Sequence, residues 1–102
     1  MYYSVSLMYK SERSDSEPPL WEERIILVSA TDEVEAEEKA KKSTREYESE
    51  FITSDSVEIA WKFHQVERVF PIDDDIEDGA ELFSRFLRQS EAESLLAPFD
   101  DN

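Results

Sequence analysis

The chain has 102 residues, a length that suits one domain with its own hydrophobic core and argues against a second domain. It carries 26 acidic and 11 basic residues, and this net charge of -15 opposes binding to nucleic acids and to anionic membranes. A basic protein partner would be attracted instead, although the same charge also serves simply to keep a small protein soluble.

Cysteine is absent from the sequence, which excludes disulfides and thiolate metal sites and suits a reducing cytosol. No basic region precedes an apolar segment at the N-terminus. No apolar run approaches the roughly 18 residues that a membrane span requires. We therefore expect a cytoplasmic protein without a targeting or anchoring segment.

The first predicted element is a half-buried strand over residues 2–9. Its apolar side chains alternate with smaller or polar ones, as a strand with one buried face requires. They are Tyr3, Val5, Leu7 and Tyr9. Residues 10–19 are polar and end in two prolines, which predicts a mobile connection. Residues 25–28 then read Ile-Ile-Leu-Val, apolar on both faces, and we expect them to form the central strand of the core.

A helix is predicted over residues 32–47. Asp32 is a suitable N-cap, and Glu35 stands where a capping box needs an acidic residue. The stripe that would face the sheet is thin and rich in alanine, so the helix is expected to dock by close approach. That stripe consists of Val34, Ala36, Ala40 and Tyr47.

Phe51 and Ile52 predict a short strand, and residues 54–56 predict a turn. A long strand follows from Val57 to Pro71. Its apolar residues change parity after His64, so we expect a β-bulge near residues 64–65.

The C-terminal third begins with an acidic loop at residues 72–79 that turns at Asp78-Gly79. Residues 80–88 fit either a helix or a strand covered on both faces, and the pattern leaves both open. Ser90 and Glu93 predict a short helix that ends near Ala97, and residues 98–102 are expected to fray.

Together these elements predict one domain over residues 1–102, of the α+β class. We expect a two-layer sandwich in which the helix at residues 32–47 covers one face of an antiparallel sheet of four or five strands. The edges of so small a sheet are exposed, so a homodimer formed by strand pairing and a monomer both remain open.

The sequence offers little for catalysis or cofactor binding. His64 is the only histidine, no Gly-x-Ser-x-Gly turn accompanies it, and Gly79 is the only glycine, which excludes phosphate-binding loops. The acidic run at residues 73–79 does not have the spacing of a calcium loop. We therefore predict no catalytic residue, no cofactor and no metal.

Two polar segments carry a resemblance to a known family. Residues 21–24 read Trp-Glu-Glu-Arg, and residues 78–84 read Asp-Gly-Ala-Glu-Leu-Phe-Ser. With the Tyr-Tyr-Ser-Val-Ser opening, over residues 2–88, the chain resembles the bacterial family of domain of unknown function 4288. Ala80 and Phe83 stand where that family would have Thr and Tyr. The resemblance implies no activity, but it points to candidate binding residues in these segments, namely Trp21, Glu22, Glu23, Arg24, Asp78, Glu81 and Ser84.

Three functions fit these observations. The first is a non-enzymatic protein-interaction module, of a regulatory or toxin-neutralising type, that recognises a basic partner by electrostatic steering. The second is a small enzyme that uses a carboxylate such as Glu23 or Glu81 as an acid or base, which would require a deep pocket around it. The third is an accessory subunit that docks a sheet edge in a larger assembly.

Overall fold

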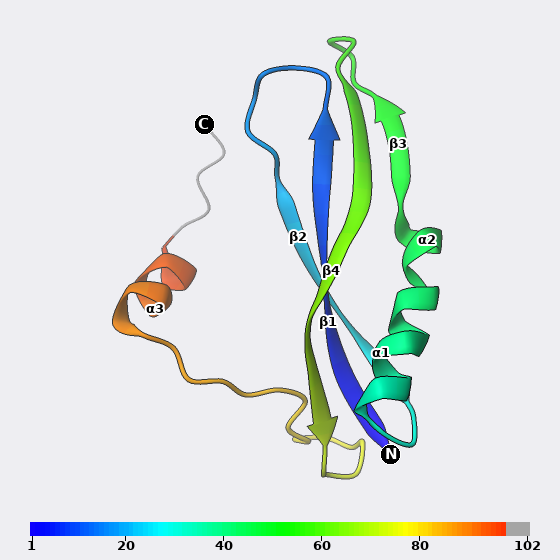
Figure 1. Cartoon of the computed structure of the whole chain (residues 1–102). Helices are drawn as coiled ribbons and strands as arrows, with labels where there is room; N and C mark the ends of the chain where they lie inside the picture. Colours follow the sequence, from blue (N-terminus) through cyan, green and yellow to red (C-terminus); the bar gives the residue numbers. More distant parts are fainter. Residues whose placement is uncertain (98–102) are drawn as a thin grey trace.

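The computed structural model describes residues 1–97, so the predicted fraying of residues 98–102 lies outside the described residues. Four antiparallel strands form one sheet, in the order β2-β1-β4-β3. The strands are β1 (Tyr2–Arg13), β2 (Trp21–Ser29), β3 (Ser49–Ile52) and β4 (Glu58–Ile72), and the helices are α1 (Glu33–Lys42), α2 (Thr44–Tyr47) and α3 (Gln89–Leu96). Figure 1 shows a strongly twisted sheet with α1 on one side and α3 standing away from it on the other.

The α+β class and the antiparallel sheet are therefore confirmed. A two-layer sandwich describes the molecule only loosely, because the sheet is curled and its helices are short. Helix α1 packs on one face of the sheet, which we call the covered face. We call the other face the open face.

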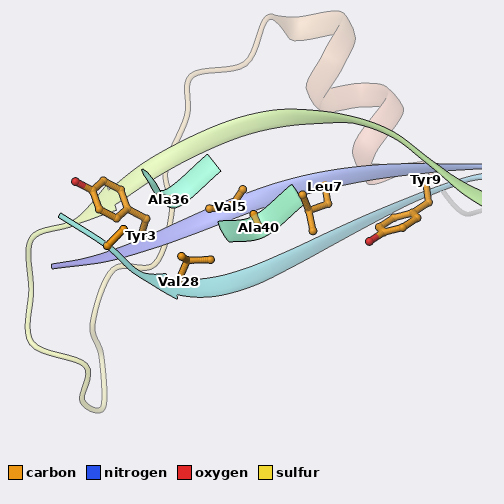
Figure 2. Close-up of a cluster of buried hydrophobic side chains, with 8 residues drawn as sticks. Tyr3, Val5, Leu7, Tyr9, Val28, Ala36 and Ala40 are labelled. Atoms are coloured by element: carbon orange, nitrogen blue, oxygen red, sulfur yellow. The ribbon is translucent and has the colours of Figure 1, made fainter. Parts of the chain in front are cut away.

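The core lies between α1 and the covered face. Figure 2 shows the alternating side chains of β1 pointing towards Ala36 and Ala40 of α1. Val5, Leu7, and the two alanines are fully buried. The predicted alternation of β1 and the close approach through alanine are thus both confirmed, and they follow from the period of two in a strand and the small side chains of the helix.

β1 is longer than predicted, because it continues through polar residues to Arg13. Lys10 pairs with Lys62 and Arg13 pairs with Ile59, so β4 supplies the backbone partners there. The buried hydroxyl of Ser11 also accepts a hydrogen bond from the Leu20 N–H at 2.9 Å. The expectation that a mobile connection begins at residue 10 was wrong, since backbone pairing does not depend on apolar side chains.

The central strand is β1, and the prediction that residues 25–28 form it was wrong. β2 lies at the edge of the sheet, where it pairs with β1 alone. Ile26 packs against the core on the covered face, whereas Ile25 and Leu27 on the open face are 50% and 51% exposed. An apolar run on both faces usually indicates that other elements cover both faces, but here Ile25 and Leu27 stay half exposed within residues 1–97.

The helix predicted over residues 32–47 is present but is divided at Ser43 into α1 and α2. The Glu35 N–H donates to Asp32 Oδ1 at 2.8 Å, as predicted for the N-cap. The Glu35 carboxylate, however, accepts from the Thr31 N–H and hydroxyl. Val34 does not face the sheet, because it is 66% exposed.

β3 and β4 agree with the sequence prediction. β4 is irregular where the parity changes, because Met8 pairs with Gln65 and Tyr9 pairs with Phe63, which leaves His64 as a bulge. A second irregularity, between the partners of Ser6 and Leu7, was not predicted. These bulges increase the local twist and help the sheet to curl.

Residues 80–88 are neither strand nor helix, and with α3 they form a segment that we call the arm (residues 80–97). Phe83 is the residue of the arm that packs on the sheet, with its ring 5.6 Å from that of Phe70 and 4.6 Å from the Arg68 guanidinium. Helix α3 starts at Gln89, just before the predicted start, and the Arg88 N–H donates to Glu91 at 3.0 Å. No residue of α3 is buried.

Tyr9 provides a test of the core. Its hydroxyl is buried and has no hydrogen-bond partner among the described residues. Because a buried unsatisfied hydroxyl costs about 1–3 kcal/mol, we expect Tyr9→Phe to leave the free energy of unfolding unchanged or to raise it by about 1 kcal/mol. Tyr47→Phe is the matched control, since the Tyr47 hydroxyl donates to Glu22 at 3.0 Å and its loss should not stabilise the fold. Urea unfolding of both variants measures the difference, and a clear loss of stability in Tyr9→Phe would contradict it.

Candidate functional site

The predicted Trp-Glu-Glu-Arg segment lies on β2, and its side chains divide between the two faces of the sheet. Glu22 and Arg24 lie on the covered face, and both contact Tyr47. The Arg24 guanidinium stacks 4.2 Å from the centre of the Tyr47 ring. The hydrogen bond to Glu22, assisted by desolvation, raises the pKa of Tyr47. This cluster joins β2 to the end of α2 and is a structural contact.

Trp21 and Glu23 lie on the open face. The Trp21 ring meets His64 edge-on at 4.9 Å, and Lys10 Nζ lies 5.2 Å from its centre. Glu23 Oε2 accepts a hydrogen bond of 2.7 Å from the Ser6 hydroxyl. Ile25 follows Glu23 on the same face and is 50% exposed.

The second predicted segment lies at the other end of the sheet. Trp21 pairs with Lys10, whereas the loop that contains Asp78 follows Ile72, which pairs with Tyr2. Asp78, Glu81 and Ser84 are all exposed, and the Glu81 N–H donates to Asp74 at 3.4 Å. The two segments are thus separated along the strands, and the fold does not bring the seven candidate residues together at one site.

The loop after β4 is instead close to the start of α1. Tyr2 pairs with both Ser29, at the end of β2, and Ile72, at the end of β4, so the chain segments that follow these residues leave the same end of the sheet. Figure 1 shows the loop and the first turn of α1 at that end. We call the carboxylates of this end and of the adjoining contact between α1 and β4 the acidic end, in which Glu67 lies furthest along β4 from the loop; they are Glu33, Glu37, Glu67, Asp73, Asp74, Asp75, Glu77 and Asp78.

The acidic end has two shallow depressions. The first, of about 400 Å³, is lined by the carboxylates of residues 73–78 together with Gly79 and Ala80. Gly79 has a φ of 88°, which allows the loop to turn there, as predicted.

The second depression, of about 300 Å³, lies between α1 and β4 and combines apolar and acidic groups. Val34, Val66 and Val69 provide the apolar surface. Glu33, Glu37, Glu67 and Arg68 surround it, and Arg68 Nη2 lies 3.4 Å from Glu67 Oε1. A lysine or arginine side chain needs this combination, because its aliphatic stem prefers apolar contact while its head prefers a carboxylate. No sequence pattern indicated this depression, since it depends on how α1 lies against β4.

Ion pairs elsewhere on the surface are local. Both guanidinium contacts of Arg13 go to Asp15, at 2.8 and 2.7 Å, and this bidentate hydrogen bonding lowers the pKa of the Asp15 carboxyl. Lys62 pairs with Glu50 at 3.1 Å, and this hydrogen bond raises the pKa of Lys62. These pairs hold the β1–β2 connection and the β3–β4 hairpin.

Within residues 1–97, no three His, Asp or Glu side chains are placed to hold a metal ion. In the same part of the chain, no helix has both the length and the apolar character that crossing a membrane requires.

Comparison with known proteins gives one result. Residues 2–84 match the family model described as Domain of unknown function (DUF4288), whereas searches of curated proteins and of solved structures gave no match. The match includes the sheet, α1 and Phe83, and it ends before Phe86 and α3. Because it spans most of the chain, this protein belongs to the DUF4288 family.

Proposed function

We propose that this protein is a non-enzymatic interaction module, regulatory or toxin-neutralising in type, that binds a basic protein partner through its acidic end. The observation that carries this proposal is the convergence of two acidic segments, the start of α1 and the loop at residues 73–78, at one end of the sheet. The net charge of -15 provides long-range attraction, and the local concentration of carboxylates selects the docking position. A cytoplasmic location agrees with a chain that lacks cysteine.

The α1–β4 depression gives this recognition a specific component. A solvated coat of carboxylates attracts any cation, but Val34 is 66% exposed beside Glu33 and Glu37. A partner that inserts a lysine or arginine here would bury apolar surface as well as pair charges. We expect the partner to present a basic side chain from a folded surface or an extended segment.

Two variants with equal changes in charge test the proposal. The first neutralises the acidic end by Asp73→Asn, Asp75→Asn and Asp78→Asn, and it spares Asp74, which accepts the Glu81 N–H. The second neutralises the opposite end by Glu12→Gln, Glu17→Gln and Glu58→Gln, whose side chains are also exposed. Because the net charge is the same in both variants, any difference in partner binding shows that the position of the carboxylates matters.

Each variant and the wild type would be used to capture proteins from a lysate of the source cell at low and high salt. We expect a basic protein that elutes as salt rises and whose affinity falls about tenfold in the acidic-end variant only. Equal loss in both variants would show that net charge alone acts. The proposal would also be contradicted if both variants bound the basic partner as tightly as the wild type. The absence of any basic partner whose binding depends on salt would contradict it as well.

A further inference from the structure

The open face of the sheet has apolar side chains that residues 1–97 leave about half exposed. Register and strand alternation place Trp21, Ile25 and Leu27 of β2 on this face, and they are 46%, 50% and 51% exposed. Between β2 and β4, β1 contributes the small residues Ser4 and Ser6. Leu27 and Phe70 flank Ser4, and Ile25 and Arg68 flank Ser6, so two rows of larger side chains border a row of serines.

The arm is the second unpartnered apolar surface. Phe86 is completely exposed, and Leu82, Leu95 and Leu96 are each more than half exposed. Figure 1 shows the arm on the open side of the sheet, with α3 projecting away from it. A soluble protein rarely leaves a phenylalanine and several leucines of one segment without contacts unless another molecule covers them.

We propose that two copies of this chain exchange arms, so that the arm of each copy packs on the open face of the other. Each copy has one arm and one open face. A dimer with a twofold axis therefore covers both surfaces in both copies, and no arm or open face is left to bind a third copy. Phe83 fixes the start of the arm at the β4 side of the open face. The remaining arm residues extend beyond it, away from the sheet of their own chain.

The charges of the arm are compatible with packing on the open face of a second copy. Two bodies as acidic as this one repel each other, but Arg85 and Arg88 offset much of the acidity of the arm. The acidic group near the middle of the open face is Glu23, which is held by Ser6. An arginine from the arm of the second copy can pair with Glu23 there while the leucines and Phe86 cover Ile25 and Leu27.

The available area is sufficient for a stable dimer. A fully exposed large apolar side chain contributes about 150–200 Å², so covering the exposed apolar side chains of one arm and one open face buries roughly 700–1,000 Å² in each copy. Standard protein interfaces bury about 800 Å² for each partner. The exchange therefore falls in the range of specific association.

Mass measurement by light scattering tests the oligomeric state. We expect a mass of twice the 11.9 kDa chain, and we expect Phe86→Glu to raise the dimer dissociation constant at least about 100-fold, because two buried phenylalanines are lost in each dimer. Phe86 is fully exposed within its own chain, so this variant should fold normally. Ile52→Glu is the control, because Ile52 is 67% exposed on β3, at the opposite edge of the sheet from β2. A wild-type protein with the mass of one chain at all concentrations would overturn the proposal.

Cysteine crosslinking tests the arrangement, since the natural chain has no cysteine. The Phe86→Cys and Ile25→Cys proteins are prepared separately, mixed and oxidised. We expect a disulfide that joins one chain of the first variant to one chain of the second. Replacing Ile25→Cys by Ile52→Cys should abolish it. A double variant, Phe86→Cys with Ile25→Cys, that crosslinks only within one chain would show that the arm folds back on its own sheet, which overturns the proposal.

The proposal is independent of the acidic end. The Asp73, Asp75 and Asp78 variant should remain dimeric even where it loses the basic partner. If Phe86→Glu abolishes capture of that partner while the wild type is monomeric, the arm serves the partner and the exchange of arms is wrong.

Discussion

Replacing Leu7 by alanine will lower the free energy of unfolding by about 2–5 kcal/mol. Leu7 is fully buried in the middle of β1, where it packs with the residues of the core between the sheet and α1. The substitution removes its transfer free energy and leaves a cavity that the two long neighbouring strands cannot fill. Chemical denaturation of the variant measures the change.

Ile52→Ala is the matched control for this substitution. Ile52 has the same number of carbon atoms and also lies in a strand, but it is 67% exposed. Its replacement should change stability by less than about 1 kcal/mol. Similar losses in the two variants would mean that the core is not centred on β1.

Enlarging Ala40 to leucine is expected to cost about 1–3 kcal/mol. Ala40 is fully buried where α1 approaches the sheet, and extra methyl groups would force the helix away from β1. Glu38→Leu adds a leucine to the exposed side of the same helix and should be nearly neutral. Thermal unfolding of both variants provides the comparison, and a stabilised Ala40→Leu would show that α1 docks less closely than the structure indicates.

Local patterns predicted the elements well. The alternation from Tyr3 to Tyr9, the N-cap at Asp32 and the parity change at His64 each had the expected structural result. Each of these features depends only on residues a few positions apart in the sequence, so the local pattern is enough to predict it. The fold class followed from the order of these elements.

The position of β2 could not be predicted, because the sequence indicates how apolar a strand is but not which molecule covers it. Ile25 and Leu27 read as core residues, and the structure leaves them half exposed at the sheet edge. The proposed exchange of arms would cover them, and the apolar pattern would then report a contact between two chains. The arm itself was ambiguous for a similar reason, since its apolar residues contact little within the chain.

The candidate site was only partly accessible to sequence reasoning. Strand alternation places Glu22 and Glu23 on opposite faces of the sheet, which divides the Trp-Glu-Glu-Arg segment. The resemblance to a family could not show that Asp78 lies at the opposite end of the sheet from Trp21. The acidic end arises from strand register, which joins residues distant in sequence. The role of Val34 depends on the rotation of α1 and was missed.

The central claim is that the chain covers one face of its sheet and leaves the other for a second molecule. Small-angle scattering with simultaneous mass measurement tests it most directly. The structure has a radius of gyration of 16.5 Å, whereas a compact chain of this length has about 13 Å. We predict a particle of two chains, or, at high dilution, a single chain near 16.5 Å. A single chain with a radius of gyration clearly below 16.5 Å would contradict the claim, because the arm would then cover its own sheet.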